Sequence, residues 1–131
     1  MKLEHFALNV EQPVELAQWY VHHLGLKIIS AQSVPPFGHF LADDSGRIMI
    51  EIYKQDAEIP NFPGMNPLTL HLAFVSEDPT SDMQRLVAAG AELVSDDKFD
   101  NGNHLVMLRD PWGISVQLCK RGNPLLTAKE F

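Results

Sequence analysis

Four side chains of the kind that bind metal ions occur at matched spacings in the two halves of the sequence. Glu51 follows His5 by 46 residues, and Gln117 follows His71 by the same 46 residues. Two imidazoles, one carboxylate and one amide oxygen form a donor set without a thiolate, which suits divalent Zn, Ni, Co, Mn or Fe. Each residue alone would be an ordinary polar residue on a strand. The matched spacing instead predicts one shared metal site of unspecified metal identity.

An internal repeat with an offset of 66 residues accounts for this spacing. Segment 5–10 aligns with 71–76, and segment 44–52 aligns with 110–118. Between these anchors, Pro13 pairs with Pro79 at the same offset, and proline suits the first turn of a helix. Because both ends and the middle agree, we expect two copies of one structural module.

The apolar pattern of each half predicts the same order of elements. A helix with an apolar stripe follows the first strand in each half, and glycine stands where that helix would end. Strands are predicted by alternation at 3–10, 26–32, 38–42 and 47–53, then at 69–75, 91–95, 104–109 and 114–119. The fold class is therefore α+β, with two tandem βαβββ modules in one domain of 131 residues. We place module 1 at about 1–56, a linker at 57–67, module 2 at about 68–120 and a tail at 121–131.

Strand alternation places the four candidate ligands on one kind of face. In segment 3–10 the apolar residues Phe6, Leu8 and Val10 share the face that a helix would cover, so His5 points the other way. The same alternation puts the other three candidates opposite their apolar neighbours. Two modules related by a pseudo-twofold axis would form a curved mixed sheet around a metal-binding cleft.

Composition excludes several classes of partner. The chain has 10 basic and 17 acidic residues, a formal net charge of −7. Nucleic acids and anionic membranes require a basic face, so neither is an expected partner. A single cysteine cannot form an internal disulfide, and no signal peptide or long apolar run is evident. We therefore expect a small, acidic, soluble and cytoplasmic domain.

These features resemble the vicinal oxygen chelate superfamily, which contains glyoxalase I, bleomycin-resistance and extradiol dioxygenase proteins. The resemblance covers about residues 1–120. It is carried by the paired modules, by the strand openings His5-Phe6-Ala7 and His71-Leu72-Ala73, by Leu24-Gly25-Leu26, and by the turn Asp110-Pro111-Trp112-Gly113. In that superfamily the first and last strands of each module supply the metal ligands, which implies His5, Glu51, His71 and Gln117 here.

The resemblance also implies a function. It indicates a metal-dependent, glyoxalase-like lyase or isomerase that chelates a small oxygenated substrate and stabilises an enediolate or oxyanion. Glu51 would be both a ligand and the catalytic base. Gln117 departs from glyoxalase I, which usually has a second carboxylate there. The set of two histidines, one glutamine and one glutamate is similar to methylmalonyl-CoA epimerase, with the Gln and Glu modules exchanged.

Alternatives remain open at this point. One is a non-catalytic binder of the bleomycin-resistance type, and another is an Fe(II) dioxygenase-like enzyme, because His5, His71 and Glu51 form a 2-His-1-carboxylate set. His104 is either a residue at the mouth of the cleft or a surface histidine, and segment 33–38 is either a mobile loop or a plain connection. Cys119 is expected to be a buried, inert thiol. Relatives generally pair, so a homodimer is expected, with ligands drawn from one chain or from both.

Overall fold

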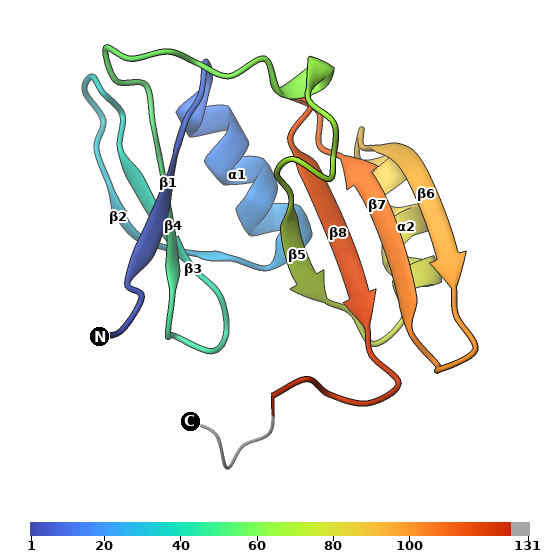
Figure 1. Ribbon diagram of the computed structural model, residues 1–131. Coiled ribbons are helices and arrows are strands. Elements are labelled where there is room, and N and C mark those ends of the chain that lie inside the picture. Colours follow the sequence, from blue (N-terminus) through green and yellow to red (C-terminus); the bar gives the residue numbers. More distant parts are fainter. Residues whose placement is uncertain (127–131) are drawn as a thin grey trace. The chain divides into compact units, whose positions relative to one another are not determined.

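The computed structural model describes residues 1–126 (Figure 1). The end of the expected tail, 127–131, lies outside the described residues. The chain forms two compact units, Met1–Pro60 and a second from Asn61 onward, which are described separately below. Within residues 1–126, neither helix is long and apolar enough to cross a membrane.

Unit 1 is a mixed four-stranded sheet with one helix. Its strands lie in the order β1-β4-β3-β2, with β1 parallel to β4 and the other neighbours antiparallel. The elements are β1 (His5–Asn9), α1 (Pro13–Leu24), β2 (Lys27–Ala31), β3 (His39–Ala42) and β4 (Met49–Tyr53).

Helix α1 covers one face of this sheet. It begins at Pro13 and is followed by Gly25, whose φ of 72° is the left-handed conformation that glycine adopts without strain. Its residues Leu16 and Tyr20 are fully buried, and α1 packs on β3 with further contacts to β2 and β4. Because Ile52 of β4 is buried on that side, Glu51 lies on the opposite, uncovered face.

Unit 2 repeats the architecture. Its strand order is β5-β8-β7-β6, again with the first pair parallel and the others antiparallel. The elements are η1 (Phe62–Gly64), β5 (Leu72–Val75), α2 (Pro79–Ala88), β6 (Glu92–Lys98), β7 (His104–Arg109) and β8 (Ser115–Lys120). The Asp78 side chain caps α2 by accepting from the Ser81 N–H at 3.1 Å. The predicted α+β class with two βαβββ modules is confirmed, as two four-stranded mixed sheets.

The start of β5 differs from the sequence-based prediction. The strand begins at Leu72 rather than at residue 69, because a turn occupies the preceding residues. Asn66 forms this turn: its side chain accepts from the Leu68 N–H at 2.9 Å, and its carbonyl accepts from the Thr69 N–H at 2.9 Å. His71 therefore lies directly before the strand instead of within it.

Candidate metal and ligand site

Two of the four candidate ligands meet in unit 1. Nε2 of His5 lies 3.4 Å from Oε2 of Glu51. The two residues come from the adjacent strands β1 and β4, where Ala7 lies opposite Glu51 and its methyl group leaves the space above it open. The His5 side chain is 36% exposed and that of Glu51 is 19% exposed, so the pair is accessible yet partly shielded.

The tautomer of His5 makes this contact informative. Its Nδ1 lies 2.9 Å from a carboxylate oxygen of Glu4, which can only accept, so Nδ1 carries a proton. In the neutral ring Nε2 then presents a lone pair to the Glu51 carboxylate. Two acceptors at this distance repel each other unless a proton or a cation lies between them. Ligands of one tetrahedral ion with bonds of about 2.1 Å lie roughly 3.4 Å apart, which agrees with the observed separation.

The other two candidates belong to unit 2. His71 donates from Nδ1 to the Pro67 carbonyl at 2.8 Å, which leaves Nε2 as the acceptor. Gln117 lies on β8 opposite Ala73, and its Oε1 accepts from the Cys119 thiol at 3.1 Å. The pairing of an alanine on the first strand with the candidate ligand on the last strand is therefore the same in both units, with an amide in unit 2 in place of the carboxylate.

No cluster of three or more His, Cys, Asp or Glu side chains suited to a metal ion forms among residues 1–126. Unit 1 brings together two such groups, while the fourth candidate, Gln117, is an amide. An Nδ1–carbonyl contact is not specific, because His22 and His39 make one too, at 2.8 and 2.7 Å. The distinguishing feature of His5 is its Nε2, which faces a carboxylate on the uncovered side of the sheet. His5 and Glu51 therefore fit a divalent cation.

His104 lies elsewhere. It is buried and shares a face of β7 with Val106, so it lies on the face opposite Gln117. Its Nε2 contacts Oδ1 of Asp96 at 2.6 Å. It therefore neither lines the uncovered face nor sits on the surface, which corrects both sequence-based expectations. The error arose because a histidine that opens a strand after a turn carries no signal of a carboxylate partner on the neighbouring strand.

Cys119 is buried, and burial raises the pKa of its thiol, an effect that the positive charge of Arg121 partly offsets. A thiol with a raised pKa is a poor nucleophile at neutral pH. This environment agrees with an inert thiol beside Gln117.

A cavity of about 300 Å³ adjoins Glu51 in unit 1. Its polar lining consists of Ser30, Gln32, Glu51, Tyr53 and Gln55. Its remaining lining consists of Pro36, Gly38 and Phe40. The sequence patterns do not predict this set of residues. Tyr53 shares the alternation of Glu51 and was detectable in principle, whereas Gln32 and Gln55 lie beyond the strand ends, where alternation carries no information.

Segment 33–38 forms a wall of this cavity and is tied to the sheet. The Pro36 carbonyl accepts from the Lys54 N–H at 2.9 Å, and the Gly38 carbonyl accepts from the Gln32 N–H at 2.8 Å. The segment thus connects β2 and β3 and also shapes the cavity with backbone hydrogen bonds at both its tip and its base.

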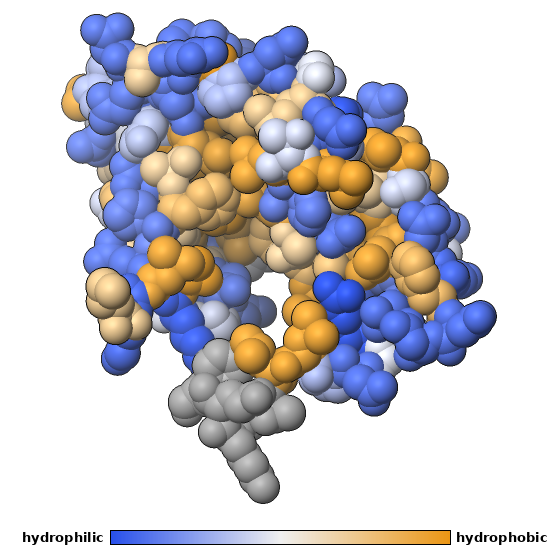
Figure 2. Space-filling view, in the orientation of Figure 1, coloured by the Kyte–Doolittle hydropathy of each residue, from blue (hydrophilic) through white to orange (hydrophobic). Residues whose placement is uncertain are grey.

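The uncovered face of unit 2 is mixed in character. In Figure 1, α2 lies behind its sheet, so Figure 2 looks onto the side of that sheet away from the helix. Apolar and hydrophilic side chains adjoin one another there (Figure 2). Such a mixture is ordinary for a protein surface and assigns no function to this face.

Comparisons with known proteins agree with this architecture. The sequence model of the Glyoxalase/Bleomycin resistance protein/Dioxygenase superfamily matches residues 2–118. The chain belongs to this superfamily. Its members generally use a divalent metal, bind small molecules and often form dimers. No curated protein sequence matches the chain significantly.

Solved structures of the superfamily share the fold. TnmS3, an antibiotic binding protein from Streptomyces sp. CB03234, is 16% identical with a TM-score of 0.71, over 92% of this chain and 96% of that one. The protein SMU.1112c is 26% identical with a TM-score of 0.69, over 92% and 98%. Lactoylglutathione lyase from Agrobacterium tumefaciens is 21% identical with a TM-score of 0.64, over 89% and 91%. A lyase and an antibiotic binding protein are thus both similar to this chain in fold.

Proposed function

We propose that the chain is a metal-dependent enzyme of the glyoxalase type, a lyase or isomerase that acts on a small oxygenated substrate. The observation that carries the proposal is the His5–Glu51 pair. Nδ1 of His5 contacts the Glu4 carboxylate, and its Nε2 faces the Glu51 carboxylate at 3.4 Å, an arrangement that a cation shared by His5 and Glu51 would stabilise.

The proposed ligands of one divalent ion are His5, Glu51, His71 and Gln117. One carboxylate against a divalent cation leaves a net positive charge for substrate oxygens. When bound, the ion would supply Lewis-acid stabilisation of an oxyanion on the substrate. All five metals remain candidates, and iron would favour the dioxygenase-like alternative, since His5, His71 and Glu51 form a 2-His-1-carboxylate set.

Glu51 is the proposed base. It is the one ionisable carboxylate of the set, it is 19% exposed, and it borders the cavity. Its carboxylate takes the proton from a substrate carbon next to a polarised carbonyl and returns it to the rearranged carbon. Gln117 cannot exchange a proton and would act only as a neutral oxygen donor.

Elemental analysis of protein purified without chelators tests the metal site. We expect about one divalent ion per proposed site in the wild type and a large loss in both His5→Ala and His71→Ala. His22→Ala on α1 is the matched control, because its imidazole also donates from Nδ1 to a carbonyl but lies on a helix. Unchanged metal content in both site variants would show that the assignment is wrong.

A second candidate function is non-catalytic binding of a small molecule. It is favoured by the cavity, which contains no basic side chain among the described residues that line it, and by the fold shared with an antibiotic binding protein. A binder needs no metal. Wild-type protein that carries no divalent ion and still binds a ligand in the cavity would support this function over the enzyme.

We also propose a homodimer, because each sheet leaves edge strands that pairing would cover. Light scattering at micromolar concentration should give twice the mass of the chain, and a monomer would contradict the proposal. Mixing His5→Ala with His71→Ala chains decides the origin of the ligands. If each site takes ligands from both chains, the mixed dimer regains one intact site and half the metal.

A further inference from the structure

The cavity next to Glu51 has an uneven distribution of charge. Glu51 is the one residue among its lining residues that is charged at neutral pH, while the hydrogen-bonding groups of Ser30, Gln32, Tyr53 and Gln55 are neutral. An anionic ligand group would find no cationic partner among them and would approach a carboxylate. A group that donates hydrogen bonds would find carboxylate, amide and hydroxyl oxygens.

The cavity also has a flat apolar side. Phe40 lies directly opposite Glu51 in the register of β3 and β4, and Ser30 lies opposite Phe40 on β2. The Phe40 ring meets the His5 ring edge to face, with centroids 5.5 Å apart. Together with Pro36 it offers an aromatic and aliphatic surface beside the polar groups, which suits a planar ligand group.

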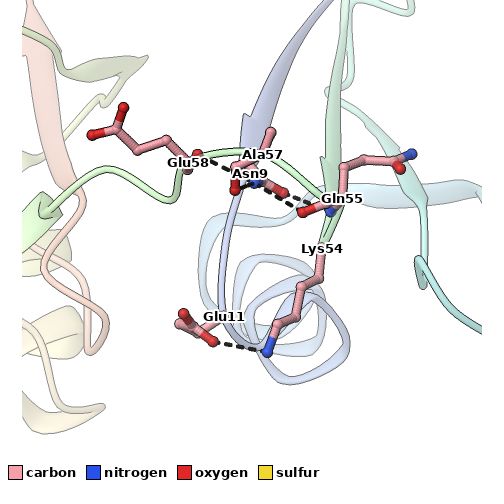
Figure 3. Close-up of polar contacts among 6 residues, drawn as sticks. All are labelled: Asn9, Glu11, Lys54, Gln55, Ala57 and Glu58. Atoms are coloured by element: carbon pink, nitrogen blue, oxygen red, sulfur yellow. Dashed lines mark hydrogen bonds and ion pairs between the residues drawn. The ribbon is translucent and has the colours of Figure 1, made fainter.

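Two glutamines in the lining of the cavity are held by hydrogen bonds that leave amide groups for a ligand. In Gln32 the bond is to the side-chain oxygen, and in Gln55 the bonds are to the backbone. Oε1 of Gln32 accepts from the Gly38 N–H at 3.2 Å, so its amide nitrogen is left to donate. The backbone of Gln55 is fixed on both sides by Asn9, whose Oδ1 accepts from its N–H at 2.7 Å and whose Nδ2 donates to its carbonyl at 3.3 Å. The side-chain amide of Gln55 extends away from Asn9 (Figure 3).

The nearest basic residue of this segment points elsewhere. Lys54 precedes Gln55, but its Nζ pairs with Oε2 of Glu11 at 2.9 Å, just before α1 (Figure 3). Successive side chains at the end of β4 therefore diverge, with the ammonium held away from the amide of Gln55. Lys54 therefore adds no positive charge to the lining of the cavity.

We infer that this cavity binds a planar ligand group that is uncharged or cationic and donates hydrogen bonds, such as an aromatic carboxamide or amidine, and that it rejects carboxylates. The inference rests on the second candidate function proposed above, the binding of a small molecule, in which no divalent ion neutralises the negative charge of Glu51. It makes a thiol conjugate of glutathione, which carries two carboxylates, a poor occupant. Gln32 and Gln55 are the specificity-determining residues, and Asn9 positions Gln55.

Three probes of one shape test the charge preference. Benzamidine, benzamide and benzoate are cationic, neutral and anionic versions of the same planar group. Binding to the full chain, freed of metal with EDTA, is followed by calorimetry and by amide NMR shifts at the cavity residues. We expect benzamidine to bind best, benzamide next, and benzoate at least about tenfold more weakly than benzamide. Equal or tighter binding of benzoate, or no binding of any probe at millimolar concentration, would overturn the inference.

Substitutions locate the effect in the cavity. Gln55→Lys should reverse the preference, with benzoate gaining and benzamidine losing about tenfold each, a gain that damage to the fold would not produce. Gln84→Ala, an exposed amide on α2, should leave all three affinities unchanged. A Gln55→Lys protein that keeps the wild-type order of affinities would contradict the role of Gln55.

Metal content of the same proteins separates the two proposals. Wild type that holds no divalent ion before EDTA treatment, yet shows the expected order of probes, would leave the inference standing and remove the metal-dependent enzyme. If His5→Ala loses its metal but the protein binds benzoate and benzamide equally tightly, the metal-dependent enzyme stands and the inference about the cavity is overturned.

Discussion

Units 1 and 2 have the same strand order, and one row of residues across each sheet shows how their side chains differ. Both edge strands, β2 and β6, carry a register shift at the same place, directly before a serine. The row reads Ala7, Glu51, Phe40, Ser30 in unit 1 and Ala73, Gln117, Met107, Ser95 in unit 2. The ends of the row are thus identical, while its centre is charged and aromatic in one unit and neutral and flexible in the other.

This difference shows how a duplicated fold can divide its tasks. The backbone pattern, including the irregularity, supports the same positions in both units, so chemistry depends on the residue at each position. Two residues further along the last strand, unit 1 has Tyr53 beside a cavity, and unit 2 has the buried Cys119 donating to Gln117. The carboxylate that can move a proton therefore adjoins a ligand space, whereas the amide is engaged by a weak donor.

Glu51→Gln should have the largest effect, because it makes the central residue of unit 1 identical to that of unit 2. It keeps a neutral oxygen donor but removes the base, so solvent deuterium incorporation at the substrate carbon should fall about 10²–10⁴-fold, far more than substrate binding. The measurement is proton exchange by NMR, once a substrate is in hand.

The double variant Glu51→Gln/Gln117→Glu sharpens the comparison. It restores the wild-type charge and number of carboxylates, so metal content should recover, but exchange should not, because the carboxylate now adjoins Cys119 instead of the cavity. Equal exchange rates in wild type and Glu51→Gln would remove Glu51 from the role of base.

Segment 55–65 is held at each end by a different side chain. Arg109 holds the end in unit 2, and we expect it to contribute more to stability than Asn9, which holds the end in unit 1. In unit 2, the Arg109 guanidinium donates to the carbonyls of Phe62 at 3.0 Å, Met65 at 2.8 Å and Gly113 at 3.2 Å. Arg109→Ala leaves three carbonyls without this donor and should lower the free energy of unfolding by about 3 kcal/mol in urea titrations. Arg85→Ala, which removes an exposed i,i+3 pair on α2, should cost about 0.5 kcal/mol or less. Equal costs would contradict this role of Arg109.

Asn9 holds the end of this segment in unit 1 through hydrogen bonds between its uncharged amide and backbone groups. Besides Gln55, its Nδ2 donates to the carbonyls of Ala57 at 2.9 Å and Glu58 at 3.2 Å (Figure 3). The equivalent residue in unit 2 is Val75, which is 86% exposed. Asn9→Val should therefore cost about 2 kcal/mol and weaken benzamide binding, while Val75→Asn should change stability little. If thermal denaturation gives similar losses of stability for Asn9→Val and Val75→Asn, positions 9 and 75 have equivalent roles in the two units.

Much of this architecture was predictable from the sequence, because the repeat, the helix-ending Gly25 and the alternation around Glu51 all depend on neighbours along the chain. The strand at His71 was set too long, since apolar alternation continued through residues that the Asn66 turn removes from the sheet. The tether of segment 33–38 and the position of His104 could not be predicted. Both depend on hydrogen bonds across strands, from Lys54 to Pro36 and between His104 and Asp96, for which one sequence carries no pattern.

The amide of Gln117 should also set the charge of the metal site. Gln117→Glu adds a second carboxylate and removes one unit of positive charge, so metal should bind more tightly while a chelating anion binds less well. We expect the affinity of the metal-loaded protein for acetohydroxamate to fall about tenfold in calorimetry. Gln84→Glu adds the same charge on α2 and should leave this affinity unchanged. An unaltered affinity in Gln117→Glu would place Gln117 outside the metal site.

The smallest expected effect concerns Cys119, the buried counterpart of Tyr53. Burial raises the pKa of its thiol above the ordinary value of 9.0, and Arg121 partly offsets the rise. In the unfolded chain the thiol ionises first, so above about pH 9 the unfolded state binds fewer protons than the folded state. The associated stability is fully present below that pH and is lost as the pH rises toward the folded-state pKa. Cys119→Ala should therefore flatten the loss of stability between neutral and alkaline pH, and iodoacetamide should alkylate native Cys119 much more slowly than the urea-unfolded chain. Rapid alkylation of the native protein at neutral pH would show instead that unit 2 presents a reactive thiol, and the contrast with the proton-transferring unit 1 would fail.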